Sequence, residues 1–505
     1  MRKIFNEKYV FYLLSEMESK YSAEILDFGS ESWPITKMFL FRTFSNKTID
    51  FESKKIIFAT KTKRLKFNFK KIICLCKSFF YKKNIINKNI ISETKNIFFS
   101  RSVYLDRLSS GTSFDRIVDP LYLTSKANVK SLKYFFDRKF LNINLYTDGY
   151  LYNQNYIKFF IPNIFKKSQR NLTKECIFFL ENFLKLNNLL FLEKTLYSEL
   201  KFSINAYINA KSNAKYFLKK FKSLKKIFLT SWYFPDAMGL IAAANELKLV
   251  TYDIQHGKQG QYQSAYSGWN FIPQKGFFNL PTYYLCWGEK SVNDILKASP
   301  NREFHLPLLG GYSWPKWYKT FISNKENKSL TKIRLLFTMQ RGKVHNKKEP
   351  IEEGLIKLVE KYDTKYKNDF QNEFHLKIRI HPNQIEESLI YLKKRLGKLY
   401  KSPVISFSSK LDCCLYDDLN WATHHLTNFS SCAIESIAFN IKSAVYGDHA
   451  YEIYREEIQK QTLFFLKKCD LEDLINWINI NNNLLSNNST DYIKNKFPNP
   501  NYFIS

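Results

Sequence analysis

The 505-residue sequence lacks the cysteine and histidine patterns of a disulfide framework or a zinc site. Its eight cysteines form no C-x-x-C pair and no Cys/His cluster at zinc spacing, and an export signal is absent. No run approaches the roughly 18 uninterrupted apolar residues that a membrane-spanning helix needs. Even "CIFFLENFLKLNNLLFL" contains Glu181 and Lys185. These absences predict reduced thiols and a cytoplasmic location, without a bilayer-spanning segment.

The sequence also lacks the loop signatures of several common enzyme classes. It contains no G-x-x-x-x-G-K-S/T loop, no G-x-G-x-x-G, no G-x-S-x-G and no D-x-D metal motif. A nucleoside triphosphatase, a nicotinamide enzyme and a metal-dependent single-lobe sugar transferase are therefore disfavoured. We expect neither a metal ion nor an organic cofactor.

Acidic residues are scarce relative to basic ones, since 78 Lys and Arg stand against 46 Asp and Glu and give a net charge of +32. The segment from Ser53 to Asn96 holds 13 Lys or Arg and one acid, Glu93, among apolar residues. Such a segment suits an anionic lipid surface, although a solvated basic face or codon bias towards lysine explains it equally. No nucleic-acid-binding motif accompanies the charge, so nucleic acid is not an expected partner.

Short β-like runs alternate with helical stretches from about residue 225. "KKIFLTS", "PDAMGLIAAANELK" and "LVTYDIQHG" predict a βαβ unit, and the alternation resumes at "IRLLFTMQ" after a polar connection near residues 312–332. Strands that alternate with helices imply parallel sheets covered on both faces. The sequence therefore predicts an α/β protein of two Rossmann-like lobes with a cleft between them. The first 200 or so residues give a weaker pattern, with a helical section around 173–222.

Four polar clusters follow predicted strands, where ligands of open parallel sheets bind. They are "YDIQHG", "TMQRGK", "RIHPN" and "TNFSSCAIE". In the first, His256 can act as a donor or proton carrier beside Gln255, and Gly257 permits a sharp turn or a close approach to a ligand. The alternative is a turn with a satisfied imidazole. Asp253 and Asp236 are the nearest carboxylates for general-base or nucleophilic work.

The second and third clusters add positive charge and an imidazole. Gln340 and Arg341 follow the first strand of the second lobe, and the arginine offers a fixed positive charge for a phosphate. Arg379, His381 and Pro382 end the next strand, where proline fixes the chain direction. The alternative for the second cluster is a basic surface loop.

The fourth cluster combines hydroxyls with a helix start. Asn428, Ser430 and Ser431 precede a helix that begins near Ser431, where free backbone N–H groups and the helix dipole favour an anion. Glu435, one turn into the helix, can accept hydrogen bonds from ribose hydroxyls. A serine N-cap followed by a capping-box-like acid is the alternative.

The order of these motifs resembles that of a known family. "QHG" after a strand, a later "HP", and "SS" followed by an acid resemble bacterial GT-B glycosyltransferases of capsule and lipopolysaccharide synthesis, in the Kdo-transferase and sialyltransferase-like branch that uses CMP-sugars. "ESWPITKMFLFRTF" and "GTSFDRIVDPLY" resemble segments of surface-polysaccharide transferases. The resemblance touches most of the chain, but only thinly in the first third.

The resemblance implies roles for the site residues. His381 and Pro382 would contact the cytidine nucleotide. Ser430, Ser431 and Glu435 would hold the phosphate and the ribose, while the "QHG" motif lines the opposite wall.

The implied activity is a metal-independent transfer of a sugar, such as Kdo or sialic acid, from a nucleotide-sugar donor to a glycan or lipid-linked glycan acceptor. The basic segment would then bring the protein to the inner face of the cytoplasmic membrane. Asp253 or Asp236 would act as the base of an inverting enzyme or the nucleophile of a retaining one. The alternatives are a CDP-glycerol-type or UDP-sugar donor, an epimerase of similar form, and a non-catalytic glycan- or membrane-binding assembly protein.

The same reading divides the chain into three parts. Residues 1–320 form an acceptor-side lobe that includes the basic segment 53–96, and residues 321–480 form the nucleotide-sugar-binding lobe. Residues 481–505 are predicted to be a tail that packs back on the first lobe.

Overall fold

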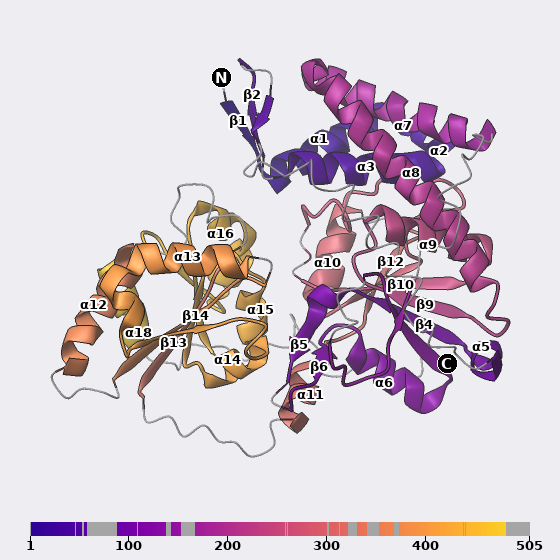
Figure 1. Ribbon diagram of the computed structural model, residues 1–505. Coiled ribbons are helices and arrows are strands. Elements are labelled where there is room, and N and C mark those ends of the chain that lie inside the picture. The colour runs from indigo at the N-terminus through magenta and orange to yellow at the C-terminus, as the bar shows by residue number, and fades with distance from the viewer. Residues whose placement is uncertain are drawn as a thin grey trace.

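The computed structural model describes most of the chain. The described residues are 2–45, 47–52, 55–57, 88–108, 110–137, 143–152, 167–257, 259, 261–299, 302–312, 314–321, 331–340, 353–367, 373–382, 384–437, 439 and 441–480. The predicted tail 481–505 and most of the basic segment 53–96 lie outside them. Two parallel sheets, each flanked by helices, organise the described part (Figure 1).

Among the described residues, the first sheet has seven strands, all parallel, in the order β12-β11-β10-β9-β4-β7-β8. The strands are β4 (Asn96–Ser100), β7 (Ser131–Phe135), β8 (Tyr150–Leu151), β9 (Lys226–Leu229), β10 (Val250–Ile254), β11 (Tyr283–Cys286) and β12 (Leu306–Leu309). The chain enters at β4, builds outward to β8, and then returns to β9 on the other side of β4. This reversal of direction is the switch point of a Rossmann-like sheet.

The second sheet repeats this plan with six parallel strands in the order β15-β14-β13-β16-β17-β18. The strands are β13 (Ile333–Thr338), β14 (Phe374–Arg379), β15 (Ile405–Ser408), β16 (His424–Thr427), β17 (Lys442–Tyr446) and β18 (Phe464–Leu466). Its switch point lies between β13 and β16. The predicted GT-B-like α/β fold of two Rossmann-like lobes is confirmed.

Helices cover both sheets. The C-terminal lobe has α12 (Glu353–Lys367), α13 (Ile385–Leu396), α14 (Leu415–Trp421), α15 (Cys432–Ile437), α16 (Asp448–Ile453), α17 (Arg455–Gln459) and α18 (Leu471–Asn479). The N-terminal lobe has α1 (Glu7–Lys20), α2 (Ser22–Asp27), α3 (Gly29–Phe44), α5 (Lys88–Glu93), α6 (Asp119–Asn128), α7 (Lys167–Leu186), α8 (Glu193–Leu218), α9 (Pro235–Glu246) and α10 (Glu289–Ala298). Helix α11 (Trp314–Phe321) connects the lobes. The helical section expected around residues 173–222 is α7 and α8.

Two small antiparallel sheets complete the N-terminal part of the chain. One joins β1 (Arg2–Phe5), β2 (Lys47–Asp50) and β3 (Lys55–Ile57), and the other is a hairpin of β5 (Leu105–Arg107) and β6 (Ser113–Asp115). The hairpin lies on the side of this lobe that faces the C-terminal lobe (Figure 1).

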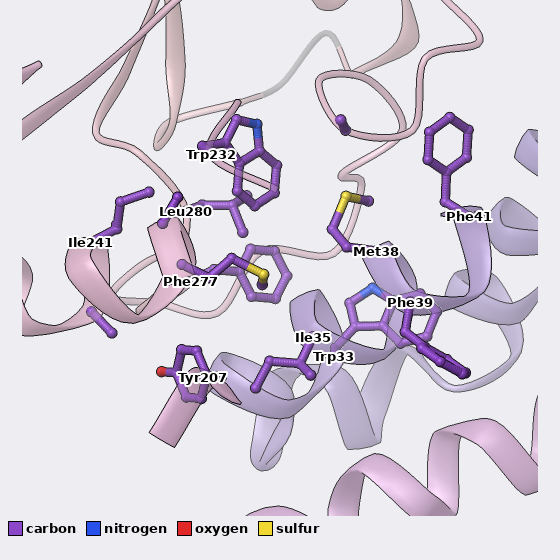
Figure 2. Packing of buried hydrophobic residues seen from close by; sticks show 14 of the residues in the cluster. Trp33, Ile35, Met38, Phe39, Phe41, Tyr207, Trp232, Ile241, Phe277 and Leu280 are labelled. Carbon is purple, nitrogen blue, oxygen red and sulfur yellow. The ribbon is translucent and has the colours of Figure 1, made fainter. Parts of the chain in front are cut away.

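The core of the N-terminal lobe packs helices against one face of its sheet. Helix α3 is almost wholly buried, so Trp33 and Met38 meet Trp232, Phe277 and other side chains of the same cluster (Figure 2). The burial of α3 extends to polar side chains, since Ser32, Thr36 and Lys37 are buried as well and Lys37 pairs with Glu18.

The other face of the same sheet belongs to a second cluster. Period-2 alternation turns Phe98, Phe228 and Tyr252 to this face, where their rings stack with centroids 4.5 and 4.7 Å apart. Side chains of the C-terminal lobe, including Leu336 and Tyr416, join this cluster. The two lobes therefore share apolar packing.

We predict that Gly239→Ala destabilises the N-terminal lobe. A Cβ at Gly239 would lie 2.6 Å from Ala210 Cβ, 2.6 Å from Lys211 N and 2.7 Å from Tyr207 O, so α9 can accept it only by moving away from the backbone of α8. Overpacking of this kind costs about 1–3 kcal/mol. The midpoint of urea unfolding, followed by circular dichroism, should fall.

Gly257→Ala is the matched control, because a Cβ there meets no described atom within 4 Å. Equal midpoints for the two variants would contradict the close α8–α9 crossing.

Candidate functional site

The two switch points define where a ligand is expected. Arg101 and Ser231 follow β4 and β9 at the first, and Gln340 and Asn428 follow β13 and β16 at the second. The two lobes are in contact, since Arg107 NH1, at the end of β5, donates to the carbonyl of Leu411, which follows β15, at 3.2 Å. We therefore treat the facing strand ends as one candidate site.

His256 lies at the end of β10 among hydroxyl groups. Its Nε2 is 3.2 Å from the Tyr233 hydroxyl and 3.3 Å from Ser231 Oγ, and its ring centroid is 5.4 Å from that of Tyr104. Burial, together with the nearby positive charge of Arg101, lowers the pKa of His256 to about 4. The imidazole is therefore neutral at pH 7. Its Nδ1 is buried and has no hydrogen-bond partner among the described residues.

Ser231 holds this group together from an unusual backbone position. Its φ is +58°, a left-handed conformation that is uncommon for a non-glycine residue. Its Oγ also lies 2.6 Å from the Tyr104 hydroxyl. Strained residues of this kind concentrate at functional sites.

Asp253 is fully buried beneath His256. One carboxylate oxygen accepts a hydrogen bond from Trp232 N at 3.1 Å, which fixes the turn between β9 and α9. Burial raises the pKa of Asp253 well above its usual value. In this geometry Asp253 positions the turn that carries Ser231 and Tyr233.

Asp236 lies at the start of α9 and is partly exposed. Its Oδ1 accepts from Arg101 NH2 at 2.8 Å and from Ala237 N at 2.9 Å. Burial disfavours the charged form of Arg101, but Asp236 compensates, and the net effect is a raised pKa for Arg101. Because 26% of the Asp236 side chain is exposed, it is the accessible member of the predicted carboxylate pair.

Gln255 and Gly257 have different surroundings. Gln255 is buried, and its Oε1 accepts from Trp287 N at 2.6 Å while its Nε2 donates to the Gly257 carbonyl at 2.7 Å. Gln255 therefore ties the ends of β10 and β11 together. Gly257 has open space where a Cβ would be, as a residue beside a ligand would need.

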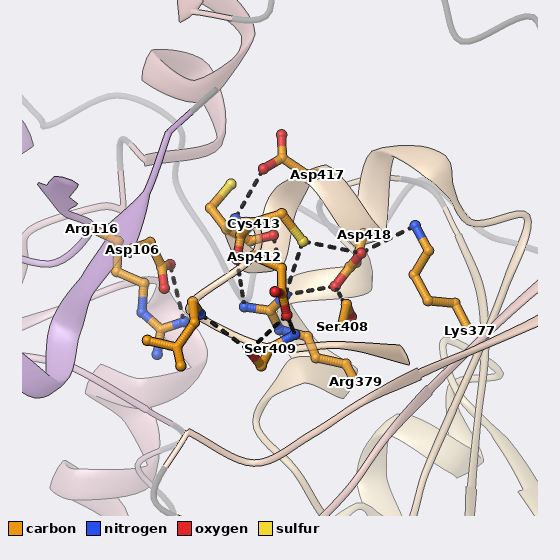
Figure 3. A network of polar contacts seen from close by, with 12 residues as sticks. Asp106, Arg116, Lys377, Arg379, Ser408, Ser409, Asp412, Cys413, Asp417 and Asp418 are labelled. Atoms are coloured by element: carbon orange, nitrogen blue, oxygen red, sulfur yellow. Dashed lines mark hydrogen bonds and ion pairs between the residues drawn. The ribbon is translucent and has the colours of Figure 1, made fainter. Parts of the chain in front are cut away.

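Arg379 takes part in a buried ionic network at the end of β14 (Figure 3). Its NH1 donates to Asp418 Oδ2 at 2.6 Å, and Lys377 Nζ lies 3.2 Å from the other oxygen of that carboxylate. The guanidinium also donates to the carbonyls of Cys413 and Cys414. Arg379 thereby fixes the loop before α14, next to the predicted phosphate position.

The fourth cluster follows β16. Asn428 Nδ2 donates to the Tyr446 carbonyl at 2.7 Å, and Ser430 Oγ accepts from Cys432 N at 3.3 Å. The backbone carbonyl of Ser431 accepts from Glu435 N at 3.2 Å, and α15 itself begins one residue later, at Cys432. The cluster thus caps a short helix at the switch point of the second sheet.

Glu435 is buried, and its Oε2 accepts a hydrogen bond from the Tyr416 hydroxyl at 2.9 Å. Burial raises its pKa, and the nearby guanidinium of Arg116 opposes the rise. Arg116 belongs to the other lobe, directly after β6, and its NH1 lies 3.7 Å from Asp106 Oδ2 (Figure 3). Arg116 thus lies close enough to the C-terminal lobe to influence Glu435, and its Nε has no hydrogen-bond partner among the described residues.

The remaining predicted residues follow strands β13 and β14. Gln340 follows β13 by two residues, and its Nε2 is buried without a hydrogen-bond partner among the described residues. His381 and Pro382 are half-buried after β14, and the His381 carbonyl accepts from Gln384 N at 3.1 Å. Arg341 lies outside the described residues.

Sequence reasoning missed four residues of the site: Tyr104, Ser231, Tyr233 and Arg116. Ser231 and Tyr233 stand in "LTSWYFPD" directly after a β-like run, which was an available signal. Arg116 lies within "GTSFDRIVDPLY", but only the tertiary structure brings it to the C-terminal lobe.

Some features are not found in the described part of the chain. No group of three or more His, Cys, Asp or Glu side chains there could hold a metal ion. Likewise, no described helix has the length and apolar character to cross a membrane.

Comparisons with known proteins give no family for the chain, since no family model and no curated protein matches it. Among solved structures, it is similar to UDP-GlcNAc 2-epimerase from Methanocaldococcus jannaschii (14% identity, 80% of this chain and 97% of that one, TM-score 0.47). It is also similar to the glycosyltransferase SnogD from Streptomyces nogalater (10%, 78% and 92%, 0.38) and the wall teichoic acid polymerase TagF (9%, 80% and 82%, 0.38). The functional argument therefore rests on the geometry of the site.

We predict that the role of Asp253 shows in the pH dependence of stability. Because its pKa is raised in the folded protein, the folded state keeps the proton that the unfolded state loses near pH 4. The stability of the wild type relative to Asp253→Asn should therefore fall as the pH rises above about 4, until the folded-state pKa is passed. Urea unfolding of both proteins between pH 4 and 8 measures this difference.

Asp253→Ala provides the comparison, because it leaves Trp232 N–H without its acceptor and should cost about 1–3 kcal/mol at every pH. A constant difference between wild type and Asp253→Asn across the pH range would show that the buried carboxyl does not retain its proton.

Proposed function

We propose that the chain is a glycosyltransferase that moves a sugar from a nucleotide donor to a glycan acceptor. One observation carries the proposal: two lobes of Rossmann-like strand order are in contact, through the Arg107–Leu411 hydrogen bond, and Arg116 of one lobe interacts electrostatically with Glu435 of the other. Nucleotides bind at the switch points of such sheets, and a second lobe can present the acceptor.

The nucleotide would bind at the ends of β13 and β16. Gln340 Nε2 supports this placement, because it is buried without a hydrogen-bond partner among the described residues and buried polar groups are normally satisfied. Asn428, Ser430, Ser431 and Glu435 surround the same switch point. His381 and Pro382 would contact the nucleotide from β14.

The departing phosphate would be stabilised by fixed positive charge. Arg116 presents a planar guanidinium whose NH1 lies 3.7 Å from Asp106 Oδ2, and, against the effect of burial, the charges of Glu435 and Asp106 raise its pKa. Arg341 would add a second cation. Charge held in place before the reaction needs no reorganisation when the phosphate develops its negative charge.

The acceptor hydroxyl would lie on the N-terminal side. His256 is neutral and is oriented by Tyr233 and Ser231, so it can receive a proton once a nearby phosphate raises its pKa. Of the two carboxylates, we propose that the partly exposed Asp236 acts on the acceptor hydroxyl and that Asp253 has a positioning role.

The donor and the acceptor are proposed from the resemblance of the motifs. It favours a CMP-linked keto sugar such as Kdo or sialic acid, and a surface polysaccharide or lipopolysaccharide as the acceptor. A UDP-sugar or a CDP-glycerol-type donor would keep the same site. The enzyme would work at the inner face of the cytoplasmic membrane without a metal ion.

We predict that a nucleotide raises the melting temperature of the purified protein and that Arg116→Gln removes most of this shift. CMP, CDP, UDP and GDP would be compared, because a ligand that binds only the folded state must stabilise it. Loss of a charged hydrogen bond of about 1.5–3 kcal/mol predicts at least tenfold weaker binding. Arg116→Lys should be intermediate, since it keeps the charge but loses the planar fork.

Arg395→Gln is the control, because this arginine pairs with Glu353 on α12, outside the site. A CMP-selective shift supports the keto-sugar donor, and a UDP- or GDP-selective shift keeps the transferase but changes the donor. The absence of any shift would contradict the proposal and favour a binding protein.

We further predict that Asp236→Asn lowers turnover at least a hundredfold while nucleotide binding persists, whereas Asp253→Asn retains most of the turnover. General acid–base groups contribute about 10²–10⁴-fold, and a positioning residue replaced by an isostere keeps its hydrogen bond. Transfer of labelled sugar to extracted glycan measures the rate. Equal losses in both variants would contradict the assignment, and release of an epimer without acceptor would indicate an epimerase.

A further inference from the structure

Lysines line the amino end of the N-terminal sheet, opposite the candidate site. Lys95, Lys130 and Lys225 each stand immediately before a strand, namely β4, β7 and β9, and all three are exposed. Their backbones are paired, since Lys225 N donates to the Lys95 carbonyl at 2.8 Å and Lys95 N to the Lys130 carbonyl at 2.9 Å. The three side chains therefore start from neighbouring strands about 4.8 Å apart, and we call them the lysine row.

The last turn of α8 and its connection to β9 extend this charge and add an aromatic ring. Lys219, Lys220 and Lys222 are exposed there, directly before the lysine row. Tyr216 is 63% exposed, and Lys220 Nζ lies 4.6 Å from the centre of its ring. A cation held over an exposed ring places positive charge and apolar surface side by side.

Phe202 continues the apolar part of this surface along α8. Its side chain is 67% exposed. It precedes Tyr216 by 14 residues, which is close to four turns of helix, so both rings lie on the outward side of α8. Exposed rings beside lysines are typical of surfaces that contact the membrane interface.

The surrounding acids neutralise little of this charge. Glu93 Oε2 lies 4.0 Å from Lys130 Nζ, and Asp148 pairs with Lys126 at 3.0 Å rather than with the row. Close, exposed like charges repel one another, so an external anion is stabilising.

We propose that this edge docks on an anionic lipid bilayer, with the lysine row and the α8–β9 connection against phosphate headgroups and with Tyr216 and Phe202 at the headgroup boundary. Lysine is a flexible point charge that suits many scattered phosphates rather than one bidentate ligand. A cavity of about 390 Å³ opens beside the row; Lys130 lines it together with Lys126 and Asp148, which pair with each other. Because the row is spread over three neighbouring strands, a broad anionic surface can contact all three lysines at once.

The proposal does not depend on nucleotide binding, because the surface and the candidate site lie at opposite ends of the strands. Strand β4 has five residues and spans about 17 Å. The docked protein would hold its site away from the lipid, facing the free end of an acceptor.

The test is co-sedimentation with vesicles of phosphatidylcholine alone and of phosphatidylcholine mixed with phosphatidylglycerol. The wild type should bind only the anionic vesicles, and less at high salt. Lys95→Glu, Lys130→Glu and Lys225→Glu combined should weaken this binding at least tenfold. The control reverses the same number of exposed charges at Lys393, Lys394 and Lys398, on and just after α13, and should bind as the wild type does.

A second variant separates lipid from other polyanions. Phe202→Ser with Tyr216→Ser should weaken vesicle binding but leave binding to heparin or single-stranded RNA unchanged. Circular dichroism checks that each variant is folded. Full vesicle binding by the lysine-row variant, an equal loss in the control, or binding of the wild type to heparin or RNA but not to anionic vesicles would each overturn the proposal.

Discussion

The arrangement of the site depends on aromatic packing that joins the two lobes. Phe114, in the β5–β6 hairpin, stacks on Trp314 of α11 with centroids 4.4 Å apart, and Trp314 in turn lies 5.5 Å from Tyr416 of α14. Arg116 follows Phe114 by two residues, and the Tyr416 hydroxyl donates to Glu435. Because Trp314 is fully buried, the packing that brings the lobes together also sets the position of the charged groups between them.

Buried ion pairs within each lobe satisfy one another, whereas some buried polar atoms at the strand ends have no hydrogen-bond partner in the described part of the chain. The pairs Lys37–Glu18, Lys133–Asp119 and Arg379–Asp418 are almost wholly buried and satisfy one another inside a lobe. His256 Nδ1 and Gln340 Nε2, in contrast, are buried at strand ends without a hydrogen-bond partner in the described part of the chain. Ser388 Oγ and Trp477 Nε1 are likewise buried without a partner there, so the candidate site is defined by the strand ends together with the His256 and Gln340 atoms.

The sequence predicted the architecture better than the chemistry. Alternating β-like runs and helices from residue 225 onward led to two Rossmann-like lobes, because the period of apolar residues reports directly on burial. The strands β4, β7 and β8 were not identified, and these three join the rest of the sheet only where β4 pairs with β9, a strand 130 positions later (Asn96 against Lys226). The choice between Asp253 and Asp236 needed tertiary burial, and Arg116 needed the fold of the hairpin. Local patterns carry neither kind of information.

The aromatic groups at the junction of the lobes also have an optical consequence. Trp287 stacks on Tyr312 with centroids 4.3 Å apart, and its indole N–H donates to the carbonyl of Gln255 in the "QHG" motif. Trp314 lies in the same apolar cluster. Two indoles thus lie where one lobe meets the other, so any shift of the lobes changes their surroundings. The native protein carries its own fluorescence reporter of lobe movement and needs no attached dye.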